Sequence, residues 1–125
     1  MTSLRFIELK TGYDDNGPAW IGRVQFSRSG RTLYFNGKAF RKAKGGGAGN
    51  HFASTGEKYW ISGIKKNGRD RHWAGSGKIT IEASAVEEYL NLVGAHQLDR
   101  TRFIVSHSIK ATSPADFHAA ENAEP

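Results

Sequence analysis

The sequence predicts a mainly-β domain of the α+β kind: a small antiparallel β-barrel of SH3-like or OB-like type, with one helix at about residues 85–93 and a final strand at about 102–109. Three observations support this. Apolar and polar residues alternate with a period of two over most of the first two thirds of the chain. Asn-Gly turn signals separate strand-like runs. Only one segment has the apolar spacing and boundary residues of a helix.

The first two predicted strands are the apolar run LRFIELK, residues 4–10, and the alternating run AWIGRVQF, residues 19–26. A stretch rich in Asp, Asn, Gly and Pro separates them and predicts a turn. Because neighbouring residues of a strand point to opposite faces, Trp20, Val24 and Phe26 are expected on one face.

Two Asn-Gly pairs predict two further hairpins. Asn36-Gly37 lies inside RTLYFNGKAF, and both residues tolerate positive φ, so a two-residue type I′ turn is expected there. By the same argument Asn67-Gly68 joins strands at 59–66 and 69–82. The glycine-rich stretch KAKGGGAGNH between the hairpins predicts a loop.

The helix is expected from its boundaries as well as its apolar stripe. Ser84 followed by Glu87 is the pattern of a capping box, and Gly94 stands where a helix ends. The stripe consists of Val86, Tyr89, Leu90 and Val93.

The chain of 125 residues suits a single domain, predicted for residues 1–110, and residues 111–125 read as a flexible tail. It has no cysteine, which excludes disulfides, thiolate catalysis and cysteine-based zinc sites. The N-terminus has no apolar leader and no stretch approaches 18 apolar residues, so a cytoplasmic protein with no membrane association is expected. We expect no cofactor and no metal.

The charge is concentrated in the middle of the chain. The formal net charge is +6, but between Arg23 and Lys78 there are 13 Lys and Arg against two acids, a net charge of +11. Such a basic segment indicates an anionic partner: nucleic acid, a phosphate-bearing ligand or an acidic protein surface. The alternative is that these charges only keep the domain soluble.

The second predicted hairpin would place several of these positive charges on one face of a sheet. Pairing around Asn67-Gly68 places one set of residues on a common face: Trp60, Ile64, Lys66, Arg69, Arg71 and Trp73. Lys65 and Asp70 would form an ion pair on the other face. Rings beside uncompensated cations suit nucleic acid, because rings stack on bases and cations neutralise phosphates. In the alternative interpretation the two tryptophans are core residues and only the basic tip meets water.

The glycine-rich loop adds Lys42 and Lys44 as candidate phosphate contacts, unless it is simply a disordered connection. Enzymatic motifs are missing: the histidines lack metal-ligand spacing, and no phosphate-binding loop or nucleophile elbow is present. A small ribonuclease or phosphodiesterase remains conceivable, with His51 or His72 and Glu57 as acid and base. Arg71 would then stabilise the phosphorane charge.

Four stretches, FIELKTGYDDNGPAWIGRV, SGRTLYFNGKAF, TGEKYWISGIKKNGRDRHWAGSGKI and AVEEYL, together resemble a family of short uncharacterised bacterial proteins. The resemblance covers about residues 6–90, and the motif around the second Asn-Gly is specific. Members sometimes carry the name 1-deoxy-xylulose-5-phosphate synthase, but the Gly-Asp-Gly diphosphate motif of that thiamine-dependent enzyme is missing here. The resemblance therefore implies a folded domain and no particular activity.

These observations predict a non-enzymatic domain that binds single-stranded nucleic acid. RNA is one candidate for this ligand. The predicted contacts are Trp60, Lys66, Arg69, Arg71, Trp73, Lys42 and Lys44. The alternatives are a protein-interaction module for an acidic partner and the small ribonuclease.

Overall fold

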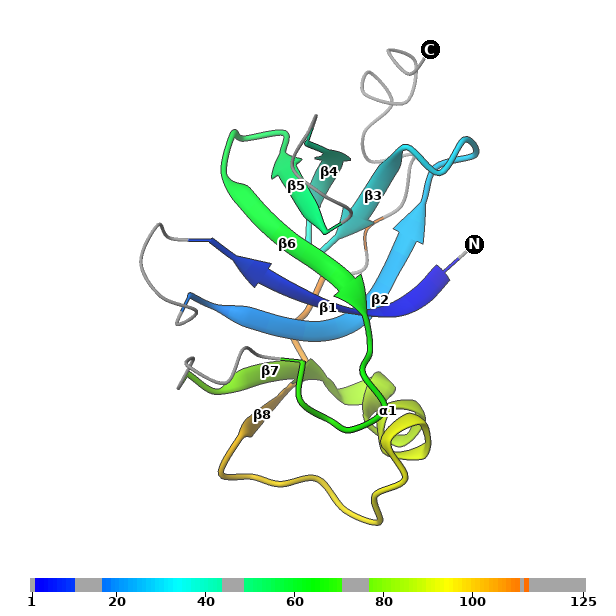
Figure 1. Cartoon of the computed structure of the whole chain (residues 1–125), viewed down its shortest axis with the longest axis vertical. Coiled ribbons are helices and arrows are strands. Elements are labelled where there is room, and N and C mark those ends of the chain that lie inside the picture. The colour runs from blue at the N-terminus through cyan, green and yellow to red at the C-terminus, as the bar shows by residue number, and fades with distance from the viewer. Residues whose placement is uncertain (1, 11–16, 44–48, 71–76, 111, 113–125) are drawn as a thin grey trace.

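A computed structural model describes residues 2–10, 17–43, 49–70, 77–110 and 112 (Figure 1). Six antiparallel strands form a closed barrel. They are β1 (Thr2–Leu9), β2 (Ala19–Phe26), β3 (Thr32–Phe35), β4 (Lys38–Lys42), β5 (Asn50–Ala53) and β6 (Lys58–Gly63). Each strand pairs with the next along the chain, and β6 pairs with β1, so the ring closes without a free edge.

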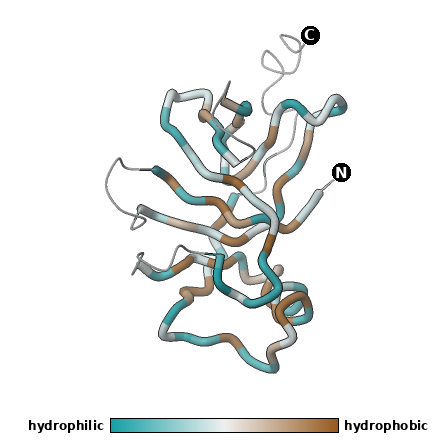
Figure 2. Tube along the Cα trace, viewed as in Figure 1, coloured by the Kyte–Doolittle hydropathy of each residue, from teal (hydrophilic) through white to brown (hydrophobic). Residues whose placement is uncertain are grey.

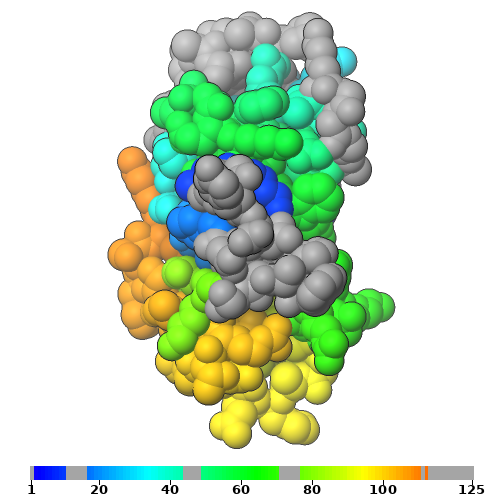
Figure 3. All heavy atoms as spheres, turned by 60° about the vertical axis from the view of Figure 1, so that its left-hand side comes forward, coloured from blue at the N-terminus to red at the C-terminus, as the bar shows by residue number. Residues whose placement is uncertain are grey.

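Two further strands and a helical segment extend the barrel on one side. β7 (Ile79–Glu82) runs parallel to β2, and β8 (Phe103–Ser106) runs parallel to β7. Between them lie the 3₁₀ turn η1 (Ala83–Ala85) and helix α1 (Val86–Val93), together 11 residues. The space-filling view shows the loop that follows α1, in yellow, at the end of the molecule away from β3–β5 (Figure 3). The predicted class, a small mainly-β barrel with one helix and a final strand, is confirmed.

The barrel wall separates two hydrophobic clusters. The interior cluster takes side chains from all six strands, among them Ile7, Val24 and Phe40. Trp20 and Phe26 pack against the same cluster, which confirms the predicted face of β2. Because each fully buried side chain of this size contributes roughly 1.5–3 kcal/mol, the interior cluster accounts for much of the stability of the barrel.

The second cluster lies outside the barrel, between the wall and the added layer. It joins Leu4 and Phe6 of β1 and Ile21 of β2 to the layer formed by β7, α1 and β8. The ring of Tyr89 on α1 packs against that of Phe103 on β8, with centroids 5.3 Å apart and planes tilted by 57°. Hydrophobic residues therefore line both faces of β1 and β2. Figure 2 shows hydrophobic residues, in brown, recurring along the strands.

The first Asn-Gly pair forms the predicted turn. Asn36 and Gly37 have φ values of 48° and 78°, and Phe35 pairs with Lys38 directly across them. Positive φ at both central residues is the signature of a type I′ turn, so this hairpin is confirmed.

The second Asn-Gly pair does not join two paired strands, and the predicted hairpin of 59–66 with 69–82 is wrong. The N–H of Gly68 donates to the carbonyl of Lys65 at 3.0 Å, so the central turn residues are Lys66 and Asn67. Gly68, with a φ of 74°, occupies the last turn position. The physical reason is that the barrel is closed. β6 already pairs with β1 on one edge and with β5 on the other, so it has no free edge for a further strand.

The hairpin had also suggested an ion pair between Lys65 and Asp70. Instead, Asp70 Oδ1 accepts a hydrogen bond from the backbone N–H of Lys65 at 2.7 Å. The carboxylate thus closes the loop through the backbone rather than through the ammonium group.

Helix α1 ends as predicted but begins differently. Gly94 is left-handed, with a φ of 70°, and its N–H donates to the carbonyl of Leu90. At the other end the N-cap is Ala85, without a side-chain cap, so the predicted capping box is wrong. Ser84 instead donates its hydroxyl to Glu82 at 2.7 Å and accepts from Arg23 at 2.9 Å. Within the described residues, no helix has both the length and the apolar character to cross a bilayer.

Candidate nucleic-acid interface

Three residues form a row across the outer wall of the barrel: Arg41 on β4, Phe52 on β5 and Lys58 on β6. Arg41 is paired with Phe52, and Phe52 is paired with Lys58. Residues directly opposite each other in a ladder share a face of the sheet, so the three side chains lie side by side. Phe52 is 46% exposed, the most exposed aromatic ring among the described residues. We call these three residues the aromatic row.

The two cations of the aromatic row are uncompensated. Arg41 and Lys58 are exposed, and neither forms an ion pair with any residue that the structure describes. Strands lie about 4.8 Å apart, so the two backbones are roughly 10 Å apart, with the ring between them. The nearest acid along the chain, Glu57, is directed to Lys38, whose Nζ lies 3.9 Å from its carboxylate.

Trp60 lies two residues beyond Lys58 on the same face of β6. Its ring is half-buried: it packs against the outer hydrophobic cluster, and its indole N–H donates to Ser62 Oγ at 3.1 Å. A Cβ placed on Gly49 would lie 2.7 Å from three atoms of the ring, so the Gly49 backbone covers part of it. Trp60 therefore has a structural role and retains an accessible part.

Lys66 and Arg69 are exposed on the segment 64–70, which we call the basic loop. They are not brought beside the aromatic row by a hairpin. Lys58 and Gly63 are the two ends of β6, about 17 Å apart at 3.3 Å per residue, and the basic loop starts beyond Gly63.

The basic loop is anchored to the layer beneath it. Arg102 donates to the carbonyl of Gly68 at 2.9 Å, and Asp70 is buried within the loop. Burial raises the pKa of Asp70, against the lowering effects of its hydrogen bond from Lys65 and of the Lys65 and Arg102 charges. Burial, together with the nearby Asp70 charge, also raises the pKa of Tyr89 on α1 to about 12.

Lys42 is exposed at the end of β4, paired with the buried His51 of β5. His51 Nδ1 lies 3.0 Å from the carbonyl of Gly49, and since a carbonyl only accepts, this nitrogen carries the proton. Burial lowers the pKa of His51, and the Lys42 charge lowers it further, although the bond to Gly49 opposes this. His51 is thus neutral near pH 7 and held in one tautomer.

The residues considered for an acid–base pair have other partners. The Glu57 carboxylate accepts a hydrogen bond from the Thr55 hydroxyl and pairs with Lys38. The remaining predicted site residues, Lys44, Arg71 and Trp73, lie outside the described residues, as does His72. In the ranges that the structure describes, no three His, Asp or Glu side chains gather as metal ligands would.

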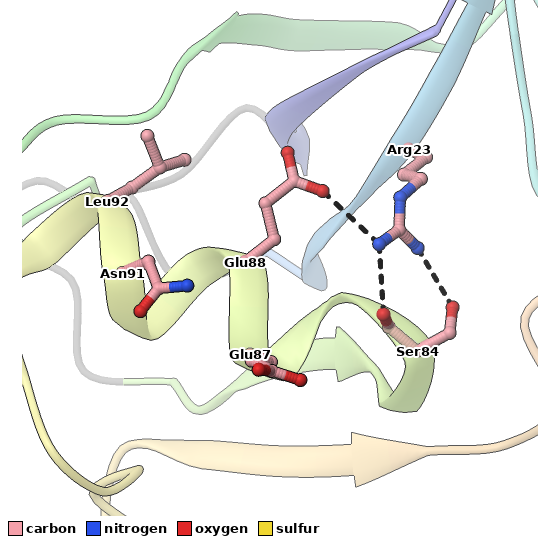
Figure 4. A pocket seen from close by; sticks show the side chains of 6 residues that line it. All are labelled: Arg23, Ser84, Glu87, Glu88, Asn91 and Leu92. Atoms are coloured by element: carbon pink, nitrogen blue, oxygen red, sulfur yellow. Dashed lines mark hydrogen bonds and ion pairs between the residues drawn. The ribbon is translucent and has the colours of Figure 1, made fainter.

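A surface depression of about 430 Å³ lies beside α1 (Figure 4). Arg23 of β2 reaches into it and donates to the Ser84 hydroxyl and carbonyl, each at 2.9 Å, and to Glu88 at 3.2 Å. Glu82 approaches the same guanidinium to 3.5 Å. With Glu87 also lining the depression, carboxylates outnumber the single cation, so this site disfavours an anionic ligand.

The aromatic row was not predicted from the sequence. Phe52 lies in NHFA, a strand of four residues directly after the glycine-rich stretch, too short for alternation to be recognised. The structure shows the alternation that the sequence hides: His51 and Ala53 are buried while Phe52 between them is exposed.

Fold and surface together define a small closed β-barrel protein with a basic, aromatic-bearing outer wall. Comparison of the chain with protein-family models, curated proteins and solved structures finds no match.

Proposed function

We propose that this protein is a non-enzymatic module that binds single-stranded nucleic acid on the outer wall of its barrel. The observation that carries the proposal is the aromatic row, an exposed ring flanked on both sides by cations that form no ion pair with a described residue. A base can stack on the face or edge of Phe52 while Arg41 and Lys58 neutralise the phosphates on either side of it.

Single strands suit this arrangement better than duplexes. In a duplex the faces of the bases are already stacked on one another, so a ring on a protein surface cannot reach them. An unpaired base leaves both faces available, and stacking on an aromatic side chain contributes about 1–3 kcal/mol per base. RNA and DNA offer the same stacking faces and phosphates, so both are expected to bind.

The test is fluorescence anisotropy with labelled single-stranded RNA, single-stranded DNA and a duplex, across a salt series. Arg41→Ala/Lys58→Ala should weaken binding and make the slope of log affinity against log salt shallower by about 1.4, from about 0.7 per phosphate contact. Phe52→Leu should lower affinity about 5- to 150-fold at every salt concentration, because 1–3 kcal/mol of stacking is lost.

The matched control is Arg28→Ala/Arg100→Ala, which removes the same charge from two exposed positions outside the aromatic row. It should change the salt slope far less. Absence of binding at low salt, or equal losses in the two double variants, would refute the proposal. Preferential binding of an acidic protein would then support the alternative function, a protein-interaction module for an acidic partner.

A further inference from the structure

We infer that the bound strand follows the outer face of β6, from the aromatic row, past Trp60, to the basic loop. This inference rests on the proposed function and adds the path and length of the ligand. It joins two groups of cations that lie at opposite ends of one strand.

The side chains along this path share one face of the sheet. Lys58, Trp60 and Ser62 alternate with the buried Tyr59 and Ile61 along β6. Since Phe52 lies directly opposite Lys58, it is the diagonal neighbour of Trp60, at roughly 7–8 Å between backbones. Two accessible rings at this separation can each contact a base of the same single strand.

Among the described residues, the track carries positive charge and no exposed acid lies along it. Glu8 lies directly opposite Trp60, but its side chain is buried, and Lys10 approaches it to 3.5 Å. At the far end, Lys66 and Arg69 are exposed with no ion pair to any described residue. The charge on the track is therefore available to phosphates.

The basic loop is held in place before a ligand arrives. The bonds of Asp70 to Lys65 and of Arg102 to Gly68 fix its backbone on both sides of the turn. The Asn67 side chain also accepts from the Arg69 N–H at 2.9 Å. A loop fixed in this way loses little conformational entropy on binding, so its cations strengthen the complex.

The geometry sets a minimum ligand length. The length of β6, about 17 Å at 3.3 Å per residue, corresponds to about five nucleotides at the ~3.4 Å spacing of a stacked strand. Ligands of two or three nucleotides can occupy only the aromatic row, whereas longer ones also reach the basic loop.

The test is a length series of labelled oligouridylates from two to twelve nucleotides, bound to the whole chain. Affinity should rise steeply up to about five to eight nucleotides and then level off. For the longer ligands the salt slope should be steeper by about 1.4, reflecting two additional phosphate contacts. Lys66→Ala/Arg69→Ala should remove this gain and leave the affinity for trinucleotides unchanged, while Arg28→Ala/Arg100→Ala should keep it.

The two proposals fail differently. If the long and short ligands bind equally well, or if Lys66→Ala/Arg69→Ala weakens both alike, the path along β6 is refuted while binding at the aromatic row stands. If no length binds, both proposals fall. Ultraviolet cross-linking of the wild-type protein to an eight-nucleotide ligand provides a second reading, since adducts are expected on Phe52 and Trp60. Adducts restricted to peptides that exclude β6 would overturn the path.

Discussion

Replacing Gly49 by alanine tests the packing that holds Trp60 on the barrel wall. A Cβ at this position would lie 2.7 Å from Cε2, Cζ2 and Cη2 of the Trp60 ring, where ordinary contacts measure 3.4–4 Å. Three ring atoms are involved and the ring is rigid, so relief requires a shift of the whole indole or of the β5 backbone. Either movement disturbs the surface that we propose for the second base.

The expected loss of stability follows from these contacts. Overpacking typically destabilises the folded state by about 1–3 kcal/mol. Alanine has fewer unfolded conformations than glycine, and this difference stabilises the folded state by about 0.4–1 kcal/mol. If the ring swings away instead, its hydrogen bond to Ser62 is lost, at about 1 kcal/mol. The overpacking route leaves a net destabilisation of up to about 2.6 kcal/mol. The hydrogen bond alone leaves up to about 0.6 kcal/mol, to which the lost packing of the ring adds, so we expect roughly 1–2 kcal/mol in all.

Urea unfolding followed by circular dichroism measures this change, with Gly63→Ala as the matched control. At Gly63, the last residue of β6, the nearest atom to a new Cβ is the flexible guanidinium end of Arg5 at 3.4 Å. The control should therefore lie within about 0.5 kcal/mol of wild type or be slightly more stable. If the Gly49 variant is as stable as the Gly63 variant, the close packing of backbone against indole is refuted.

Two further predictions concern the layer that supports the basic loop. Burial holds the folded-state pKa of Asp70 above its ordinary 3.8, so wild-type stability should decline as pH rises from that value through the raised pKa. In the Asp70→Asn variant, the free energy of unfolding in urea should not decline in this way between pH 4 and pH 7. A variant with the same pH profile as wild type would contradict this prediction. Arg23→Ala should lower stability by roughly 1–2 kcal/mol by releasing β2 from Ser84 and Glu88, a figure reduced for partial exposure. Arg28→Ala in the same thermal or urea assay should change stability by less than about 0.5 kcal/mol, and equal losses would rule out the link.

The two Asn-Gly pairs show how far local sequence determines the fold. At Asn36-Gly37 both neighbouring strands have free edges toward each other, so the intrinsic preference for a type I′ turn is realised. At Asn67-Gly68 the preceding strand is already paired on both edges, and the same dipeptide is shifted by one position into a different turn. Long-range pairing of the strands that close the barrel determines which of the two turns forms. A window of ten residues does not contain this information.

The capping box failed for a related reason. Ser84 has the right spacing to Glu87, but a guanidinium from Arg23, 61 residues away in the sequence, takes its hydroxyl. By contrast, the end of α1 at Gly94 was predictable because a left-handed residue there depends only on its own lack of a side chain. Signals that need no distant partner were reliable, and those open to competition from elsewhere in the chain were not.

The candidate site illustrates the same limit. Lys66 and Arg69 were predicted from their charge and from a hairpin pairing that the structure contradicts, yet the structure does expose both. The aromatic row joins three strands through their register, and no local pattern contains that information.

The asymmetry of the barrel supports the proposal that a ligand binds to the wall formed by β4, β5 and β6. On β1 and β2 the outward positions are occupied by apolar residues such as Phe6 and Ile21, and β7, α1 and β8 cover them. On β4, β5 and β6 the corresponding outward row contains Arg41, Phe52 and Lys58, and it remains exposed. Burial of the first wall requires no ligand, because the chain covers it itself. The second wall combines an uncovered ring with cations that repel one another, and a polyanion with unpaired bases satisfies both.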